Sequence, residues 1–232
     1  MNLQVVEQRG LYLRVGANLY SILRRGLDVI VASLLLLLLA PVLLVIAIAI
    51  RADSPGPILF RQQRVRGGWR PEMGPPEKRL FTFYKFRSMY ANADPRVHQQ
   101  HVTDYINGIH RPQGTTVKLH NDRRVTRLGR LLRRTSLDEL PQLFNVLRGD
   151  MTLVGPRPSL PYEVTQYKDW HRQRLTVTPG LTGLWQVSGR SRLTFEEMVR
   201  LDIEYVQRRS LLYDLQILLR TLPAVVEGGG AC

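Results

Sequence analysis

Cysteine is nearly absent from this sequence, which has one cysteine, Cys232, among 232 residues. This excludes a disulfide framework and a four-cysteine zinc site. Acidic residues are also scarce: 19 Asp and Glu stand against 33 Lys and Arg, a formal net charge of +14. The positive surplus indicates an anionic partner, either nucleic acid, membrane headgroups or phosphorylated substrates. The apolar content of 44% excludes a disordered or collagen-like polymer, and the length fits one domain.

Charged side chains are absent from the run Val29 to Ile50, whose 22 residues include six consecutive leucines. At about 1.5 Å per residue, a straight helix of this length crosses a hydrocarbon core of about 30 Å. The alternative is a buried core helix, which would normally carry a polar stripe. Because Ser33 is the one polar side chain in the run, the sequence favours a membrane helix.

Pro41 interrupts this apolar run. Inside a helix, proline removes one backbone hydrogen bond and clashes with the carbonyl group four residues earlier, so we expect a kink there. Two topologies follow: a kinked helix that spans the membrane, or a helix that breaks and returns to the same leaflet. Basic residues flank both ends of the run, so neither flank resembles a translocated segment. These residues alone leave both topologies open.

The chain divides into three predicted segments. Residues 1–27 are predicted to form an interfacial lead-in helix, residues 28–51 the membrane helix, and residues 52–232 a basic domain with helices that lie against the membrane. The expected fold is mainly α with a small β element, for which the aromatic, β-prone stretch Leu80–Met89 is the candidate strand. Residues 66–79 are rich in glycine and proline and are expected to form a loop.

The rest of the chain is predicted to be polar loop and short helices. Residues 90–122 are polar, and we interpret His98 and His101 as solvated loop histidines, because no second pair of metal ligands has matching spacing. Apolar periodicity and a Thr-x-x-Glu capping box predict helices in the second half. They run from Leu140 to Leu147, from Thr194 to about Arg208, and from Leu211 to Val226, the last broken by Pro223 and suited to lie on a membrane.

An acidic pair, Asp138 and Glu139, opens the Leu140–Leu147 helix. One interpretation is structural: Ser136 and Glu139 match a capping box, and acidic residues favour the first turn of a helix. The other is chemical, because Arg133, Arg134, Arg148 and Arg157 lie close by in the sequence. A carboxylate among several arginines is ionised at neutral pH and can bind Mg²⁺ or attack a phosphorus atom.

Two turn-rich segments each carry an arginine. Gly155-Pro156-Arg157-Pro158 is either a surface turn or a rigid holder for an arginine that clamps a phosphate or a base edge. Residues 179–190, PGLTGLWQVSGR, combine predicted tight turns, one aromatic residue and the terminal Arg190. Each segment taken separately is a weak signal.

Taken together, four segments behind a proline-broken apolar run closely resemble the bacterial sugar transferase family, whose small members are monotopic phosphoglycosyl transferases. The resemblance covers roughly residues 22–226. The segments are DSPGPILFRQQRV (53–65), FYKFRSM (83–89), RRTSLDELPQLFNVLRGDMTLVGPRP (133–158) and PGLTGLWQVSGR (179–190).

The resemblance implies an enzyme that moves a sugar 1-phosphate from a nucleotide diphosphate sugar, usually a UDP-sugar in the family, to polyprenyl phosphate. This step starts the assembly of exopolysaccharide, capsule, O-antigen or glycoprotein glycans. The implied location is the bacterial inner membrane with the catalytic domain on the cytoplasmic face, and the family's broken helix favours re-entrance. A homodimer stays open.

Residue roles carry over from the same motifs. Asp138 matches a nucleophile that forms a phospho-sugar intermediate and also binds Mg²⁺, and Glu139 matches the second acid. Lys85 and Arg133 match basic residues of the active site. The motif Pro156-Arg157-Pro158 matches one associated with the nucleotide, and we count Arg148 and Arg190 as further substrate-binding candidates.

Two departures from the family pattern stand out. Small members often have Ser before the breaking proline, where this chain has Ala40, so a hydroxyl–backbone bond is missing there. The 66–79 loop is longer and richer in proline than expected, which puts in doubt any substrate contacts carried over from this region.

Two other functions compete with this interpretation. A basic, membrane-tethered nucleic-acid binder would use the arginines that fall on one predicted helical face, Arg123, Arg127, Arg130 and Arg134. It leaves the acidic pair and the two turn-rich segments unexplained, and no nucleic-acid motif is present. A non-catalytic scaffold for polysaccharide assembly would need neither Asp138 nor Glu139.

Overall fold

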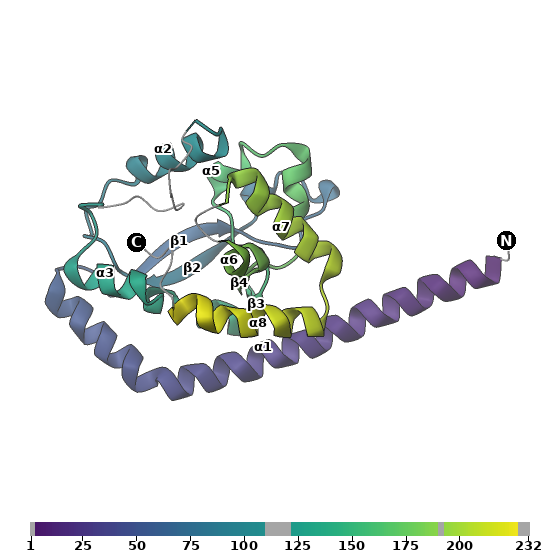
Figure 1. Cartoon of the computed structure of the whole chain (residues 1–232), viewed down its shortest axis with the longest axis horizontal. Coiled ribbons are helices and arrows are strands. Elements are labelled where there is room, and N and C mark those ends of the chain that lie inside the picture. Colours follow the sequence, from purple (N-terminus) through teal and green to yellow (C-terminus); the bar gives the residue numbers. More distant parts are fainter. Residues whose placement is uncertain (1–2, 110–121, 190–192, 227–232) are drawn as a thin grey trace.

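A computed structural model describes residues 3–109, 122–189 and 193–226. Most of these residues are helical and two small sheets complete the fold, which confirms the expected mainly α fold with a small β element. Figure 1 shows the long helix α1 along one side of a body that holds the other elements, with α8 next to it. In chain order the elements are α1 (Leu3–Asp53), β1 (Leu59–Val65), η1 (Pro71–Met73), η2 (Pro76–Lys78), β2 (Leu80–Phe86), α2 (Pro95–Ile106), α3 (Arg127–Arg134), η3 (Leu137–Glu139), α4 (Gln142–Arg148), β3 (Thr152–Val154), α5 (Pro161–Val164), η4 (Asp169–Thr176), β4 (Gly180–Thr182), α6 (Leu184–Ser188), α7 (Phe195–Arg208) and α8 (Leu211–Val226).

Helix α1 is continuous from Leu3 to Asp53, so the structure carries one helix across the expected boundary between residues 27 and 28. Pro41 lies inside it, and Figure 1 shows that α1 is bent. The hydrogen bond that proline lacks, together with its steric clash, explains a bend in an otherwise regular helix. Within the described residues, Leu19–Asp53 is the one helix long and apolar enough to cross a membrane.

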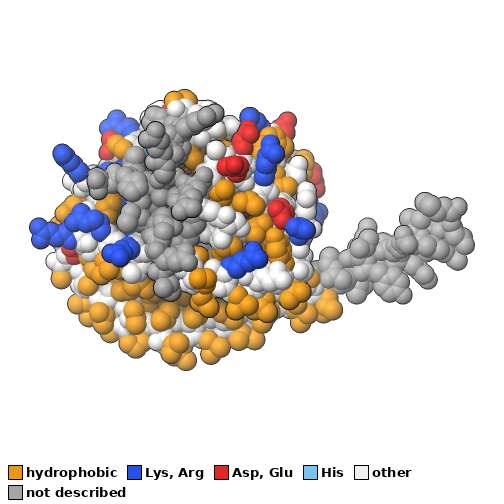
Figure 2. Space-filling model, viewed as in Figure 1, with side chains coloured by type: hydrophobic (Ala, Val, Ile, Leu, Met, Phe, Trp, Pro, Cys, Tyr) orange, Lys and Arg blue, Asp and Glu red, His pale blue; other side chains and the backbone are white. Residues whose placement is uncertain are grey.

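The outward face of α1 is apolar and exposed. Leu37 and Leu38 have 76% and 74% of their surface exposed. Figure 2 shows hydrophobic side chains gathered along the side of the molecule where α1 and α8 lie. Contiguous apolar surface of this kind marks contact with a membrane or another protein. The fold therefore supports membrane association of α1.

The inward face of α1 belongs to the core of the body. Ala32 is fully buried in a cluster with residues from β2, α4, β3, α7 and α8. Asp28 is buried and accepts a hydrogen bond of 2.9 Å from the backbone N–H of Leu153 in β3. Arg24 donates to Thr152 Oγ1 at 2.7 Å and to the carbonyl of Val154. These contacts fix α1 to strand β3.

Strands β1 and β2 form an antiparallel hairpin, with Leu59 opposite Phe86 and Val65 opposite Leu80. Strand β2 confirms the predicted strand, although it ends at Phe86 rather than Met89. Strand β1 was missing from the sequence prediction, because residues 61–64, RQQR, give no alternation of apolar and polar side chains. The expected loop between them contains two short 3₁₀ turns, η1 and η2.

Strands β3 and β4 pair in parallel and bring the two turn-rich segments together. The backbone N–H of Gly155 donates to Thr182 O at 2.8 Å, and that of Gly180 donates to Pro156 O at 2.9 Å. A Cβ atom on Gly155 would lie 2.8 Å from the nitrogen of Gly180, so glycine is needed for this approach. The prediction of tight turns for 179–190 was wrong: residues 180–188 form β4 and the short helix α6.

The C-terminal helices largely follow the sequence pattern. The capping box of Thr194 and Glu197 is present at the start of α7. The predicted break of the last helix at Pro223 was wrong, because α8 is continuous to Val226. Pro223 is exposed and lies three residues before the helix end, where water can solvate the carbonyl that loses its partner. The predicted helix after the acidic pair is shorter than expected and begins at Gln142.

Candidate active site

Asp138 and Glu139 lie in η3, a single 3₁₀ turn between α3 and α4. Ser136, just before this turn, has left-handed backbone geometry with φ of 58°. In this described part of the chain, no side chain caps η3 or α4, and the N-cap position of α4 is held by Pro141. The capping-box interpretation of Ser136 and Glu139 was therefore wrong. The acidic pair does occupy the first turn of η3, as the structural interpretation expected.

Lys85 on β2 contacts both carboxylates. Its Nζ atom lies 2.9 Å from Glu139 Oε1 and 3.7 Å from Asp138 Oδ2. The Asp138 side chain is 4% exposed, whereas those of Glu139 and Lys85 are 29% and 20% exposed. An ammonium group between two carboxylates offsets their mutual repulsion. The structure thus brings three of the four predicted catalytic residues into one cluster at the protein surface.

Arg133, the fourth predicted catalytic residue, lies at the end of α3 next to this cluster. Its Nε atom donates to Ser88 Oγ at 2.9 Å. Burial lowers the pKa of Arg133 from its usual value, and the nearby charge of Asp138 acts in the opposite direction. Helix α3 comes close to Ser88 because Gly129 has no side chain: a Cβ atom there would lie 2.0 Å from Ser88 O.

Asn145 connects the helix after the acidic pair to the strand that carries Lys85. This side chain is fully buried. Its Oδ1 atom accepts the backbone N–H of Tyr84 at 3.1 Å, and its Nδ2 atom donates to Thr82 O at 2.6 Å. The carboxamide thus occupies the free edge of β2 as a neighbouring strand would. Because Lys85 directly follows Tyr84, Asn145 fixes Lys85 relative to the carboxylates.

Arg157 follows β3 and is half-buried between the buried prolines Pro156 and Pro158. The buried Arg64 of β1 donates to Pro158 O at 2.9 Å and to Gln62 Oε1 at 2.8 Å. Burial, with the positive charge of Arg157, lowers the pKa of Arg64 to about 10, while Glu139 is among the groups that act in the opposite direction. Arg64 therefore experiences the charges of both Arg157 and the carboxylate cluster.

His98 lies on helix α2 on the arginine side of the site. The prediction of solvated loop histidines was wrong, because His98 and His101 are both half-buried on this helix. The Nδ1 atom of His98 lies 2.8 Å from the hydroxyl of Tyr162. Burial, followed by the charges of Arg157 and Arg64, lowers the pKa of His98 to about 3. His98 is thus a neutral imidazole beside two arginines at neutral pH.

The remaining predicted binding residues lie elsewhere. Arg148 is exposed, and its contacts are with Asp150 at 3.5 Å and with the Tyr84 hydroxyl at 3.3 Å. Arg190 lies outside the described residues. Sequence reasoning missed Arg64, Asn145, His98 and Tyr162. The RQQRV stretch and the residues around Asn145 carried a family signal, but burial and partners are not visible in a motif.

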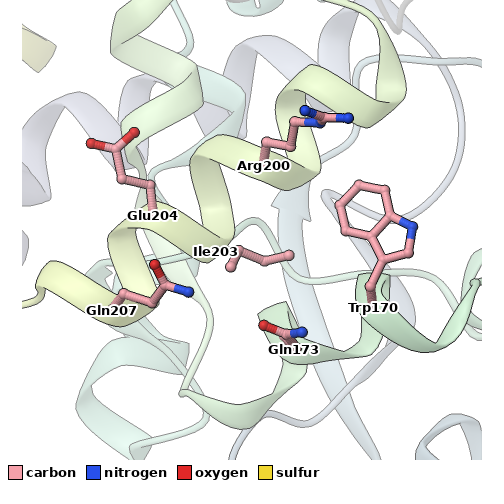
Figure 3. Close-up of a pocket in the computed structure, with 6 residues that line it drawn as sticks. All are labelled: Trp170, Gln173, Arg200, Ile203, Glu204 and Gln207. Atoms are coloured by element: carbon pink, nitrogen blue, oxygen red, sulfur yellow. The ribbon is translucent and has the colours of Figure 1, made fainter.

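Two hollows on the described surface lie away from the carboxylate cluster. An open hollow of about 320 Å³ lies between η4 and α7, lined by Trp170, Gln173, Arg200, Ile203, Glu204 and Gln207 (Figure 3). A smaller one is lined by Arg157 and Pro158 together with residues of α2 and α7. The larger hollow therefore contains none of the predicted site residues, whereas the smaller one adjoins Arg157.

The donor set of the site suits a hard cation with few protein ligands. Within the described residues, no group of three or more His, Cys, Asp or Glu side chains gathers around a point. The adjacent oxygen donors of Asp138 and Glu139 instead offer one or two carboxylates. Mg²⁺ is usually held in this way, with water and substrate phosphates completing its shell. The residues present fit Mg²⁺ and do not form a zinc site.

Comparison with known proteins gives a consistent result. The family model described as bacterial sugar transferase matches residues 19–228. An undecaprenyl-phosphate galactose phosphotransferase of Salmonella typhimurium is 39% identical over 210 residues, covering 90% of this chain and 41% of its own length. A UDP-glucose:undecaprenyl-phosphate glucose-1-phosphate transferase of Caulobacter vibrioides is 42% identical over 221 residues, covering 90% of this chain and 71% of its own.

A shorter relative is similar over most of its own length. The exopolysaccharide production protein ExoY of Sinorhizobium fredii is 39% identical over 211 residues, which cover 91% of this chain and 88% of the relative. By contrast, the chain spans less than half the length of several curated relatives it matches, the Salmonella protein among them. The matched region includes both the carboxylate cluster and the turn that carries Arg157.

Proposed function

The chain belongs to the bacterial sugar transferase family, and from this premise we propose that it transfers a sugar 1-phosphate from a nucleotide diphosphate sugar to polyprenyl phosphate. The observation that carries the proposal is the cluster of Asp138, Glu139 and Lys85 at the protein surface, next to Arg133. The charges of Glu139 and Arg157 both act on the pKa of the buried Arg64. Names of relatives that mention UDP-glucose and undecaprenyl phosphate support a UDP-sugar donor and a polyprenyl acceptor. Names that mention exopolysaccharide support a role at the start of glycan assembly.

The proposed reaction has two displacements at one phosphorus atom. A carboxylate oxygen of Asp138 attacks the phosphorus that carries the sugar, and an O–P bond forms. The bond from this phosphorus to the bridging diphosphate oxygen breaks, and the nucleoside monophosphate leaves with the electron pair. A phosphate oxygen of the polyprenyl phosphate then attacks the same phosphorus, and the Asp138 carboxylate leaves. Each polyanionic substrate thus reacts in turn.

The residues around Asp138 would provide positive charge and position. Lys85 holds the two carboxylates in place, and Arg133 on α3 lies close enough to Asp138 for the two charges to interact. Mg²⁺ is the proposed cofactor: Asp138 would hold it with the substrate phosphates, and when bound it offsets negative charge on the diphosphate. Arg157, held between two prolines, would bind the nucleotide diphosphate of the donor.

The proposed topology is re-entrant, with the N-terminus and the catalytic domain both on the cytoplasmic face of the inner membrane. The bend in α1, the position of Pro41 inside the helix and the contacts of both arms of α1 with the body support it. Cysteines introduced at residues 4 and 70 in a Cys232→Ser background should resist a membrane-impermeant reagent added to intact cells. Labelling at either position would show that this segment is translocated and would reject the topology.

Mass spectrometry tests the reaction itself. The protein, incubated with Mg²⁺ and a UDP-sugar but no lipid acceptor, should gain the mass of one sugar phosphate on the peptide that contains Asp138. Release of nucleoside monophosphate should precede addition of the acceptor, and initial rates should follow a ping-pong pattern. A sequential pattern without the adduct would reject the covalent step, while transfer without release of a nucleoside monophosphate would reject the proposed function.

A further inference from the structure

Helix α3 carries a face of arginines that the proposed reaction does not use. Arg127, Arg130 and Arg134 are exposed and lie at spacings of three and four residues, on one side of the helix. Leu131, between them, has 55% of its surface exposed. Among the described residues, no carboxylate lies within ion-pair distance of these three guanidinium groups. The arginine face predicted from the sequence also included Arg123, which lies outside this helix because α3 begins at Arg127. Nucleic-acid binding was the competing interpretation of that face.

The opposite side of α3 packs against the C-terminal arm of α1. Leu128 and Leu132 belong to a cluster with Leu43, Ile46 and Ile50 of α1. In Figure 1, α3 lies next to the end of α1 that precedes β1. The arginine face therefore projects from a helix that is in direct contact with the apolar helix of the chain.

The position of the face relative to the apolar surface points to its partner. Figure 2 shows Lys and Arg side chains at the edge of the hydrophobic surface, on the side where α3 lies. An exposed leucine among arginines is the composition of a surface at the boundary between acyl chains and headgroups. Arginine also binds phosphate groups with two parallel hydrogen bonds.

We propose that the α3 face, formed by Arg127, Arg130, Leu131 and Arg134, docks on the headgroups of anionic phospholipids. The inference rests on α1 lying in the membrane and does not depend on the transfer reaction. It has a consequence for the site, because Arg133 on the same helix points inward to Ser88, next to Asp138. Docking of α3 would hold the carboxylate cluster close to the headgroups, where a lipid phosphate acceptor is presented.

A nucleic-acid partner fits this placement less well. The basic face is one helix of eight residues with an exposed leucine at its centre. A polyanion on this face would cover the exposed side chain of Leu131. Phosphate groups attached to acyl chains satisfy both the arginines and the leucine. The positive charge of the three arginines and the apolar surface beside them together favour a lipid headgroup as the partner.

An environment-sensitive dye at residue 131 tests the proposal in the full chain. The protein with Leu131→Cys and Cys232→Ser is reconstituted in nanodiscs of phosphatidylcholine, with or without about 30% phosphatidylglycerol. Each basic residue at an anionic membrane raises the affinity for that surface by about fivefold. Three arginines together therefore give about a hundredfold preference for the anionic surface. We expect the dye emission to shift to shorter wavelength with phosphatidylglycerol, and the shift to shrink as salt rises.

Two charge variants separate a local effect from net charge. The first variant should remove the dye response; it combines Arg127→Gln, Arg130→Gln and Arg134→Gln. The matched control removes three exposed arginines elsewhere, with Arg70→Gln, Arg96→Gln and Arg200→Gln, and should keep it. If circular dichroism shows that the first variant does not fold, the test is the salt dependence of the dye emission in the protein that keeps all three arginines.

Four outcomes would overturn the proposal. The first is the same emission in the two kinds of nanodisc, and the second is equal loss of the response in the control variant. The third is an equal shift with about 1% polyprenyl phosphate in phosphatidylcholine, which would make the face an acceptor site. The fourth is a shift caused by duplex DNA at physiological salt in phosphatidylcholine nanodiscs, which would make it a nucleic-acid surface. None of these readouts needs donor or turnover.

Discussion

The two sides of the candidate site are built from opposite chemistry. On the carboxylate side, Asp138 and Glu139 share the ammonium group of Lys85, so charges of both signs are paired within a few ångströms. On the arginine side, Arg157 and Arg64 lie beside a neutral imidazole, that of His98. One side therefore combines charges of both signs, whereas the other carries two arginines.

This difference in charge suits the two sides of the site to different tasks: the carboxylate side to the reaction and the arginine side to binding. A buried carboxylate, Asp138, beside a partly exposed one, Glu139, can form a bond to phosphorus and take up a metal ion. Arginines beside a neutral histidine provide a positive environment: burial first, and then the charges of Arg157, Arg64, Arg124 and His101, lower the pKa of His98. Such an environment suits a ligand that arrives with two phosphates. Variants on the carboxylate side and on the arginine side should therefore affect different steps.

The largest effect is expected for Asp138→Asn. This change keeps the size of the side chain but removes the proposed nucleophile, so kcat should fall by at least about 10³-fold, equivalent to about 4 kcal/mol in activation free energy. The melting temperature should change little. The matched control is Asp169→Asn, at a fully exposed carboxylate, which should retain full turnover. A near-normal rate for Asp138→Asn would assign the chemistry to another residue.

A loss of stability is expected for Asn145→Ala. The change leaves the backbone N–H of Tyr84 and the carbonyl of Thr82 without the partner that the carboxamide supplies. Two unsatisfied backbone groups in the interior cost about 2–4 kcal/mol in the free energy of unfolding. Denaturant unfolding in detergent measures this cost, with the exposed Asn107→Ala as control. If Asn145→Ala were as stable as the parent protein, water would have to replace the carboxamide at the edge of β2.

Arg157 separates binding from reaction on the arginine side. Arg157→Ala should raise the donor KM or lower kcat/KM by about 10–100-fold, because charge-assisted hydrogen bonds to a phosphate are worth about 1.5–3 kcal/mol. Arg157→Lys should lose less, since it keeps the charge. Initial rates with varied donor concentration measure the effect, and Arg200→Ala serves as control. Unchanged donor kinetics in both variants would make the Pro-Arg-Pro turn a structural element.

The smallest effect concerns the acid sensitivity of His98. Its pKa in the folded protein is about 3, whereas an unfolded histidine titrates near 6.5. Between these values the unfolded chain binds the extra proton, so the stability contributed above pH 6.5 is lost as the pH falls towards 3. When the pH falls from 6.5 to 4.5, the free energy of unfolding of the parent protein should decrease by about 1–2 kcal/mol more than that of the His98→Gln variant. Parallel losses in both proteins would show that His98 is protonated in the fold without penalty.

Local signals in the sequence predicted much of the fold. Strand β2, the capping box of α7 and the end of α4 before Gly149 were predicted because each depends on neighbouring residues. Strand β1 could not be predicted in this way, since its pairing with β2 replaces the missing alternation. Helix α2 was missed because its sequence is polar, and its buried side chains, Val102 and Tyr105, depend on partners distant in the chain.

The candidate site divides in the same way. The family motifs predicted Lys85, Arg133, Asp138 and Glu139, and the structure brings these residues together. The capping interpretation of Ser136 failed because the residue takes a left-handed conformation, which a sequence pattern does not reveal. Arg64 and His98 could not be found either, because their lowered pKa values arise from burial and from the charge of Arg157, which is distant in the sequence.

The attachment of α1 to β3 couples the apolar helix directly to the turn that carries Arg157. Asp28 and Arg24 bind the three residues of β3, and the turn that carries Arg157 directly follows that strand. Helix α1 and the turn that carries Arg157 are therefore joined by hydrogen bonds rather than by a flexible tether. A change in the length of a linker would leave their relative position unchanged. A bilayer of different thickness that tilted α1 would carry β3 and this turn with it, so membrane thickness would act on the position of Arg157.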